Sequence, residues 1–357
     1  MTGDRAWGWV QHLRDGGTTP WAHWTGTADS AGAVVPGAQQ LELLRRLNEA
    51  HAPTRRLVDR VLGASAPGRG QPELELLGAV EETPFGPRPV DPAALPVGEL
   101  LRVAAGLLAE DLVARGLPGP AKQGRPRPWR RSYRLHGDPE LVDPVRAHLV
   151  ARGRPPGGRD PVHLIVVSDL GLMLAHLWTA RAFGAKLPGW RVWLRTLRRS
   201  GGLPDRIDPL AVARALADQS SPDRIHIVVD TDALPGLVGV RRLPDPPPGL
   251  AAAAPDLARR VSSYAGLLVP ADQRRALMRR TLRPRLAGVD GPPLALPVAH
   301  RGWLEDHADR IAEGVRRAGY AVHGDLAGLA PVRRPGVAAP APRETLALAM
   351  RMLTEET

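Results

Sequence analysis

The stretch from Arg131 to Asp169 constrains the fold most, because a complete strand, turn, helix and second strand can be recognised in it. Ser132–His136 alternates apolar and polar side chains, as a half-buried strand does. Gly137-Asp138-Pro139 then breaks the strand, and apolar residues recur at helical spacing from Pro139 to Arg152, with Asp138 placed as the N-cap. Val162–Val167 is the most β-branched apolar run in the chain. The pattern predicts two parallel strands joined by a helix, which is the repeating unit of an α/β fold.

A third buried strand is predicted at Arg224–Val229, and Asp230-Thr231-Asp232 closes it. The carboxyl ends of parallel strands meet at one edge of a sheet, where α/β proteins bind their ligands. The polar residues after the three strands are therefore the candidate binding residues: Gly137, Asp138, Pro139, Ser168, Asp169, Asp230 and Asp232. Their many carboxylates favour a cationic or hydroxyl-rich ligand, or Mg²⁺ with a nucleotide, over a bare anion.

Composition bears on compartment and on nucleic acids. No apolar run approaches the roughly 18 residues that a membrane helix needs, no leader sequence is evident, and cysteine is absent. We therefore expect a soluble cytoplasmic protein with no membrane association. The formal net charge is +11, but Lys122 and Lys186 are the only lysines. An arginine-dominated chain rich in Ala, Gly and Pro is typical of a high-GC genome, so a nucleic-acid-binding protein with an arginine-rich surface is a minor alternative.

Breaks in the pattern divide the chain into four parts. Residues 1–116 are predicted to form a helical lobe, and residues 117–130 a linker rich in Pro, Gly and Arg. Residues 131–334 contain the α/β pattern, and residues 335–357 a second linker and a C-terminal helix. We expect the lobe to pack on the α/β domain. Two independent domains joined by a flexible linker are the alternative.

Four tryptophans are concentrated in the first 24 residues: Trp7, Trp9, Trp21 and Trp24. Aromatic side chains at helical spacing pack inward more often than they face a ligand. If these four are exposed instead, they form the surface on which a protein partner would dock.

The histidines show no pair with the spacing and intervening carboxylate of a zinc helix. His136, His163 and His226 fall in predicted strands and are expected to pack there, whereas His300 and His307 are expected on the surface of a helix. No catalytic constellation and no metal site is predicted.

From Arg131 onward, the order of elements resembles the sulfotransferase-like proteins of actinobacteria. The resemblance is carried by Val162–Arg181, which includes Ser168-Asp169-Leu170, by the passages between Trp190 and Asp230, and by Arg301–Leu326. It implies an α/β fold of the three-layer P-loop type, with helices on both faces of the sheet. In active members it also implies sulfuryl transfer from 3′-phosphoadenosine 5′-phosphosulfate. The segment before Leu117 has no counterpart in the resemblance.

The chain departs from that family at the cofactor loop, which reads Gly-x-Pro-Lys-Thr-Gly-Thr-Thr. Aligned on Gly137 and Pro139, this chain has Glu140 in place of the lysine and Asp143 in place of a hydroxyl, and Ser168 stands where the family has an arginine. Carboxylates at a helix N-terminus repel a phosphosulfate. We therefore expect a non-catalytic relative that acts in binding or as a scaffold, with no assigned cofactor. An active sulfotransferase, or another nucleotide-dependent transferase, is the alternative.

Overall fold

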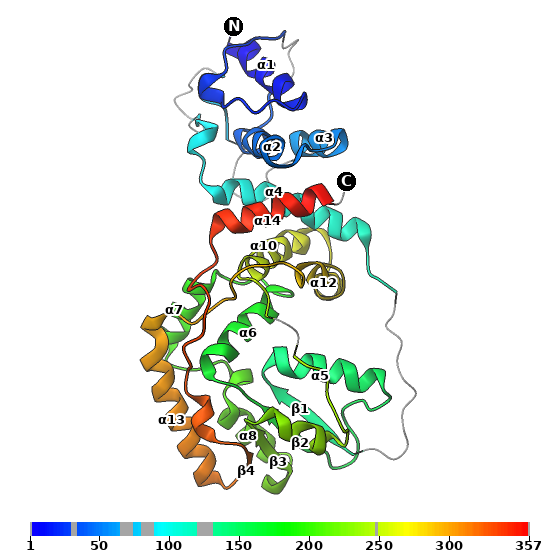
Figure 1. The fold of residues 1–357 in the computed structure, drawn as a ribbon, viewed down its shortest axis with the longest axis vertical. Coiled ribbons are helices and arrows are strands. Elements are labelled where there is room, and N and C mark those ends of the chain that lie inside the picture. The colour runs from blue at the N-terminus through cyan, green and yellow to red at the C-terminus, as the bar shows by residue number, and fades with distance from the viewer. Residues whose placement is uncertain are drawn as a thin grey trace.

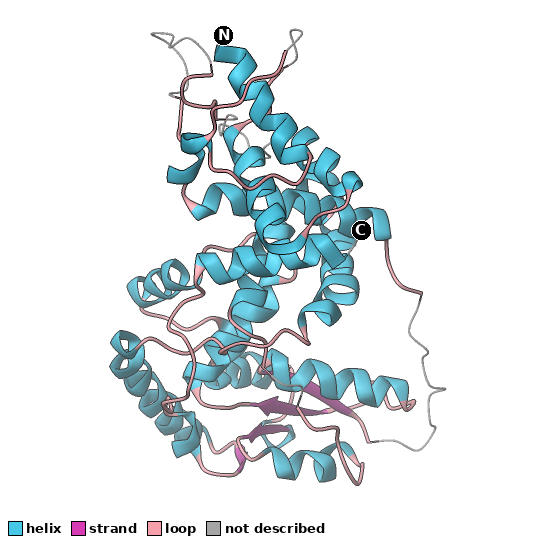
Figure 2. Ribbon diagram, turned by 45° about the horizontal axis from the view of Figure 1, so that its top comes forward, coloured by secondary structure: helices cyan, strands magenta, loops and turns pink. Residues whose placement is uncertain are grey.

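The structure, a computed structural model, describes residues 2–29, 34–64, 74–79, 89–119, 131–246 and 249–355. It contains a parallel four-stranded sheet in the order β1-β2-β3-β4, surrounded by helices (Figure 1 and Figure 2). The strands are β1 (Tyr133–Gly137), β2 (Val162–Val166), β3 (Ile225–Val228) and β4 (Ala321–His323). The prediction of an α/β fold with a parallel sheet is confirmed.

The sheet is apolar on both faces because alternate residues of each strand enter separate cores. Leu135, Leu164 and Val166 share one face in the strand register and pack with α5 (Pro139–Ala151) and α9 (Leu234–Val238). Ile165 and its register neighbour Ile227 share the other face, which packs with α8 (Pro209–Ala217). Burial on both faces explains why β2 reads as an unbroken apolar run.

The helices between the strands follow local sequence signals closely. The helix predicted from Pro139 to Arg152 is confirmed as α5, and the later helices include α6 (Leu170–Ala182), α7 (Trp190–Ser200) and α13 (Arg301–Ala318). Asp138 caps α5 and Asp169 caps α6, each by accepting a hydrogen bond from a backbone N–H of the first turn. These two caps fix where α5 and α6 leave the sheet, and they place Asp138 and Asp169 at its carboxyl edge.

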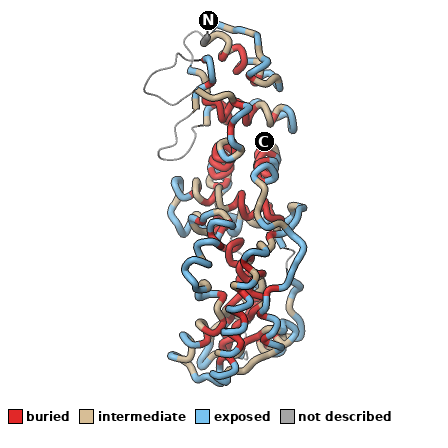
Figure 3. Tube along the Cα trace, turned by 90° about the vertical axis from the view of Figure 1, so that its left-hand side faces the viewer, coloured by how far each residue is buried: buried red, intermediate tan, exposed pale blue. Residues whose placement is uncertain are grey.

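The N-terminal lobe consists of α1 (Thr2–Arg14), α2 (Ala38–His51), α3 (Arg55–Gly63) and α4 (Val97–Arg115). Helix α4 packs against α10 (Ala253–Leu268) and against the C-terminal helix α14 (Pro342–Glu355), which lies beside it (Figure 1). Buried residues run continuously from the lobe to the sheet (Figure 3). The chain after Leu268 continues through α11 (Ala271–Leu277), a π-helical turn (Met278–Leu282) and α12 (Arg283–Leu286).

The tryptophans of the lobe face inward, as their spacing favoured, and Trp9 and Trp21 are buried, so these two do not form part of a contact surface for a partner. The indole of Trp9 donates to the carbonyl of Thr19 at 2.9 Å, and that of Trp21 donates to the carbonyl of Leu77 at 3.1 Å. Trp7 and Trp24 are partly buried and pack against the same core. The inward packing favoured from the sequence is therefore confirmed for Trp9 and Trp21.

Most of the predicted linker 117–130 lies outside the described residues, which include only 117–119 of it. Arg280 donates to the carbonyls of Pro118 and Gly119, each at 2.7 Å, so the start of the linker follows the π-helical turn. Within the described ranges, no helix combines the length and the apolar character needed to span a bilayer.

Candidate functional site

Gly137 ends β1 in a backbone conformation that only glycine adopts without strain. Its φ is +100°, and an added Cβ would lie 2.0 Å from the carbonyl oxygen of Val166 on β2. The two strands therefore approach each other at their carboxyl ends more closely than any side chain at this position would permit. This close approach brings the residue after β1 against the residues after β2.

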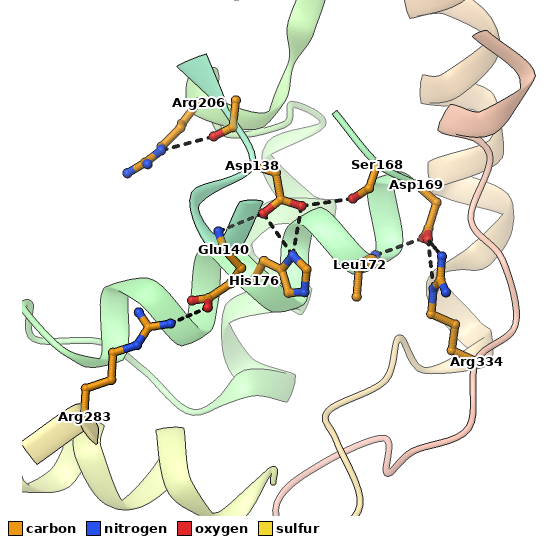
Figure 4. Close-up of polar contacts among 10 residues, drawn as sticks. Asp138, Glu140, Ser168, Asp169, Leu172, His176, Arg206, Arg283 and Arg334 are labelled. Carbon is orange, nitrogen blue, oxygen red and sulfur yellow. Dashed lines mark hydrogen bonds and ion pairs between the residues drawn. The ribbon is translucent and has the colours of Figure 1, made fainter. Parts of the chain in front are cut away.

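Asp138 is fully buried between the ends of β1 and β2. One carboxylate oxygen accepts the backbone N–H of Glu140 at 3.0 Å, and the other accepts the hydroxyl of Ser168 at 2.9 Å. The Nδ1 atom of His176, on α6, lies 2.8 Å from the same carboxylate (Figure 4). Because a buried carboxylate needs several donors to be stable, Asp138 is a completed structural centre that joins β1, β2, α5 and α6.

Glu140, in the first turn of α5, is paired with an arginine from a distant part of the chain. Arg283, on α12, forms an ion pair with its carboxylate (Figure 4). The same guanidinium lies over the ring of Phe183, with its carbon 5.6 Å from the ring centroid. The Glu140 carboxylate thus interacts with the helix dipole and with Arg283 together.

Asp143 is also paired: Arg146 lies 2.7 Å from its carboxylate and Arg206 lies 3.4 Å from it. Arg206 additionally donates to the carbonyl of Gly137 at 3.3 Å. Both carboxylates in the first half of α5 are therefore paired with arginines, and the preference for a cationic ligand at the sheet edge stays a prediction. Arg206 and Arg283 come from distant parts of the sequence that no local pattern connects to α5, whereas Arg146 lies three positions after Asp143.

Asp169 follows β2 and faces away from Asp138. One of its oxygens caps α6 by accepting the N–H of Leu172 at 2.9 Å. The other accepts two N–H groups of Arg334, at 3.0 and 2.8 Å (Figure 4). Asp169 thus links the start of α6 to the segment that leads to α14.

The predicted site residues divide into groups. Gly137, Asp138, Pro139 and Ser168 lie together around the start of α5, with Asp169 next to them. Asp230 and Asp232 are exposed, and Asp230 only caps a short helical turn by accepting the N–H of Asp232 at 2.9 Å. In the described part of the chain, no recorded contact joins these two residues to Asp138 or Asp169.

His176 is the site residue that the sequence did not reveal. Its side chain is 21% exposed, and no hydrogen bond of its Nε2 atom is recorded among the described residues. The only available signal was a single imidazole in the otherwise apolar helix α6. Its partner Asp138 lies 38 positions earlier, a distance at which one sequence predicts no contact.

Other histidines form pairs or are buried. His136 and His163 are joined across β1 and β2 with their ring nitrogens 3.1 Å apart, and His226 and His323 are joined at 3.0 Å. Burial, with the neighbouring His163, Arg134 and Arg146, lowers the pKa of His136 to about 4.

The surface prediction for His300 and His307 is wrong, because their side chains are only 7% and 6% exposed. The ring of Trp303 contacts both imidazoles edge-on, and burial lowers the pKa of each. His300 immediately precedes α13, and at His307 the periodic pattern of α13 did not distinguish its buried stripe from its exposed one.

No family model, no curated protein and no solved structure matches this chain. Within the described ranges, no group of three or more His, Asp or Glu side chains is arranged to hold a metal ion.

Proposed function

We propose that this chain is a non-catalytic relative of the sulfotransferase-like proteins, with their three-layer P-loop type of α/β arrangement, and that it acts by binding or as a scaffold. One observation carries the proposal: the N-terminus of α5, where a cofactor phosphate would bind, is occupied by the chain's own Asp138. The turn at Asp138 therefore stabilises the fold and does not bind a cofactor.

The charges around α5 support this proposal. A phosphosulfate site works by directing backbone N–H groups, a helix N-terminus and a lysine toward the anion. Here Asp138 accepts the N–H of Glu140, and the Glu140 carboxylate stands in the same turn. An incoming phosphosulfate would have to displace a buried carboxylate and approach a second one. Positioning and charge stabilisation supply nearly all of the catalysis in such transfers, so little activity is expected without them.

Calorimetric titration with 3′-phosphoadenosine 5′-phosphate tests the proposal. We expect no binding heat from the intact protein, and none from a Glu140→Lys variant, because Asp138 still occupies the helix N-terminus in that variant. Circular dichroism of both proteins checks that they are folded. Micromolar binding by the intact protein would contradict the non-catalytic assignment.

A transferase is the second candidate, and His176 is the observation that favours it. Because the Asp138 carboxylate accepts a hydrogen bond from Nδ1, the Nε2 atom carries the lone pair and has no recorded partner. An imidazole oriented in this way by a buried aspartate can accept the proton of an attacking hydroxyl group.

The transferase candidate is tested by incubating the protein with 3′-phosphoadenosine 5′-phosphosulfate and a panel of phenols and alcohols. If it is right, 3′-phosphoadenosine 5′-phosphate is released, and His176→Gln lowers the rate about 100-fold or more. Absence of turnover with the whole panel would remove this candidate and leave the binding function standing.

A further inference from the structure

A pocket of about 510 Å³ opens beside the start of α6, on the side of Asp169. Three stretches that are far apart in sequence line it: the first two turns of α6, residues 294–301 and residues 332–338. Its size falls within the roughly 300–1,000 Å³ range of small-molecule sites. None of the sequence signals for a binding site pointed to the last two stretches.

The wall of this pocket is held together by backbone contacts. Ala295 donates to the carbonyl of Val337 at 2.9 Å, and Val337 donates to the carbonyl of Pro293 at 2.9 Å. Gly336, between them, has a φ of +149°, and an added Cβ would lie 2.5 Å from the Pro293 oxygen. The two stretches are therefore joined at a position that requires glycine, and the wall is formed before any ligand arrives.

The pocket has an excess of positive charge. Arg301, Arg333 and Arg334 line it, with Asp169 as the only acidic residue of the lining. Asp169 binds the guanidinium of Arg334 and the N–H of Leu172, so both of its oxygens are engaged. In the described structure no ion pair or hydrogen bond is recorded for the guanidinium groups of Arg301 and Arg333. Two arginines thus remain available to an anion, next to a third that Asp169 holds in place.

The rest of the lining is apolar. The apolar side chains of the lining come from α6 and from the stretches 294–301 and 332–338. They include Leu172, Ala175, Leu296, Val298 and Val332. Val298 and Val332 are 79% and 57% exposed, so they add exposed apolar surface to the lining. A small inorganic anion would leave this surface in contact with water, whereas an apolar body attached to the anion would cover it.

We propose that this pocket binds an amphiphilic organic anion, a carboxylate with an apolar chain, whose head group pairs with Arg301 and Arg333 and whose chain lies against Leu172 and Val332. The site is separate from the start of α5 and does not depend on the function proposed for it. Its ligand is recognised by charge at one end and by apolar contact at the other.

Calorimetry with octanoate, 1-octanol and acetate tests the two requirements. We expect octanoate to bind at least about tenfold more tightly than either octanol, which lacks the charge, or acetate, which lacks the chain. Octanol binding as tightly as octanoate would overturn the role of the arginines. Equal binding of acetate would overturn the role of the chain, and no octanoate binding would overturn the site itself.

Variants locate the binding. Arg301→Gln and Arg333→Gln should each weaken octanoate binding about tenfold, because each removes one charge-assisted contact. Arg310→Gln is the matched control, since Arg310 is exposed on the same helix and does not line the pocket. Val332→Asp places a negative charge at the exposed rim and should weaken binding without affecting the core. Unchanged affinity in all three pocket variants, with the fold intact by circular dichroism, would contradict the assignment.

Discussion

The carboxyl ends of β1 and β2 are neighbours in the sheet, yet they lead to opposite kinds of surface. After β1, Asp138 is fully buried and Glu140 is paired with Arg283, so both carboxylates interact with other groups of the protein. After β2, Asp169 holds Arg334 at the edge of a pocket in which Arg301 and Arg333 have no recorded partners in the described structure. The sequence favoured a cationic ligand at this edge, whereas the arginines beside the end of β2 support the anion that we propose for the pocket.

The largest effect is expected from Gly137→Ala, which disrupts the close approach of β1 and β2 at their carboxyl ends. The new Cβ would lie 2.0 Å from the Val166 oxygen at a φ of +100°. Strain and overpacking together should lower the free energy of unfolding by about 3 kcal/mol or more. Gly201→Ala is the control, because Gly201 also has a positive φ but open space around it, and it should cost about 1 kcal/mol. Urea unfolding of both variants measures the difference, and equal losses would contradict the close approach.

Asp138→Asn should have the next largest effect. The amide keeps the shape of the carboxylate, but it loses the charge that receives hydrogen bonds from Ser168 and His176. We expect a loss of about 2 kcal/mol in the free energy of unfolding. Asp230→Asn, which changes an exposed cap, should stay within about 0.5 kcal/mol. If the two variants lose similar amounts of stability, Asp138 is not the centre of a buried cluster.

The pH dependence of stability should report on His136 of β1. Its pKa in the folded protein is about 4, mainly because of burial, and lies below the ordinary value of 6.5. The unfolded chain therefore binds a proton at a higher pH than the folded one. The stabilisation is complete above pH 6.5 and is lost as the pH falls from 6.5 toward 4.

His136 contributes a slope of up to about 1.4 kcal/mol per pH unit within that window. The pKa values of His163, His300, His307 and His323 are lowered by burial in the same direction, so they add to the slope. Urea unfolding at several pH values should show a shallower slope in His136→Gln than in the unmodified protein. Identical slopes would mean that His136 is not protected from protonation.

The smallest effect on stability is expected at the end of β2. Arg333→Gln removes an exposed guanidinium with no recorded partner, so the free energy of unfolding should change by less than about 0.5 kcal/mol. Arg283→Gln, which leaves Glu140 unpaired in a half-buried position, should cost more than that. Thermal unfolding of the two variants compares a free arginine with a paired one, and a larger loss from Arg333→Gln would reverse the proposed distinction.

The sequence predicted the helices and strands of this fold better than the tertiary contacts of their side chains. The helix after Asp138, the strands around β1, β2 and β3, and the Asp138 cap all depend on residues a few positions apart, and the structure confirms them. Arg283 and Arg334 come from 143 and 165 positions beyond their partners, so no local pattern could connect them to Glu140 and Asp169.

The buried His300 and His307, and the packing partners of the inward tryptophans, illustrate a second limit. Periodicity identifies the residues that share a face, but the packing partner decides which face is buried. For Trp9 and Trp21, that partner includes Leu77 and Thr19, which lie in irregular segments with no signal of their own.

Hydrogen–deuterium exchange in the presence of excess 3′-phosphoadenosine 5′-phosphate tests the central claim most directly, because it reports on each strand end separately. If Asp138 occupies the start of α5, exchange of the backbone amides of Asp138 and of residues 140–142 should be unchanged by the nucleotide. Protection of these amides by the nucleotide would show that the N-terminus of α5 accepts a phosphate, and would contradict the claim that Asp138 occupies it.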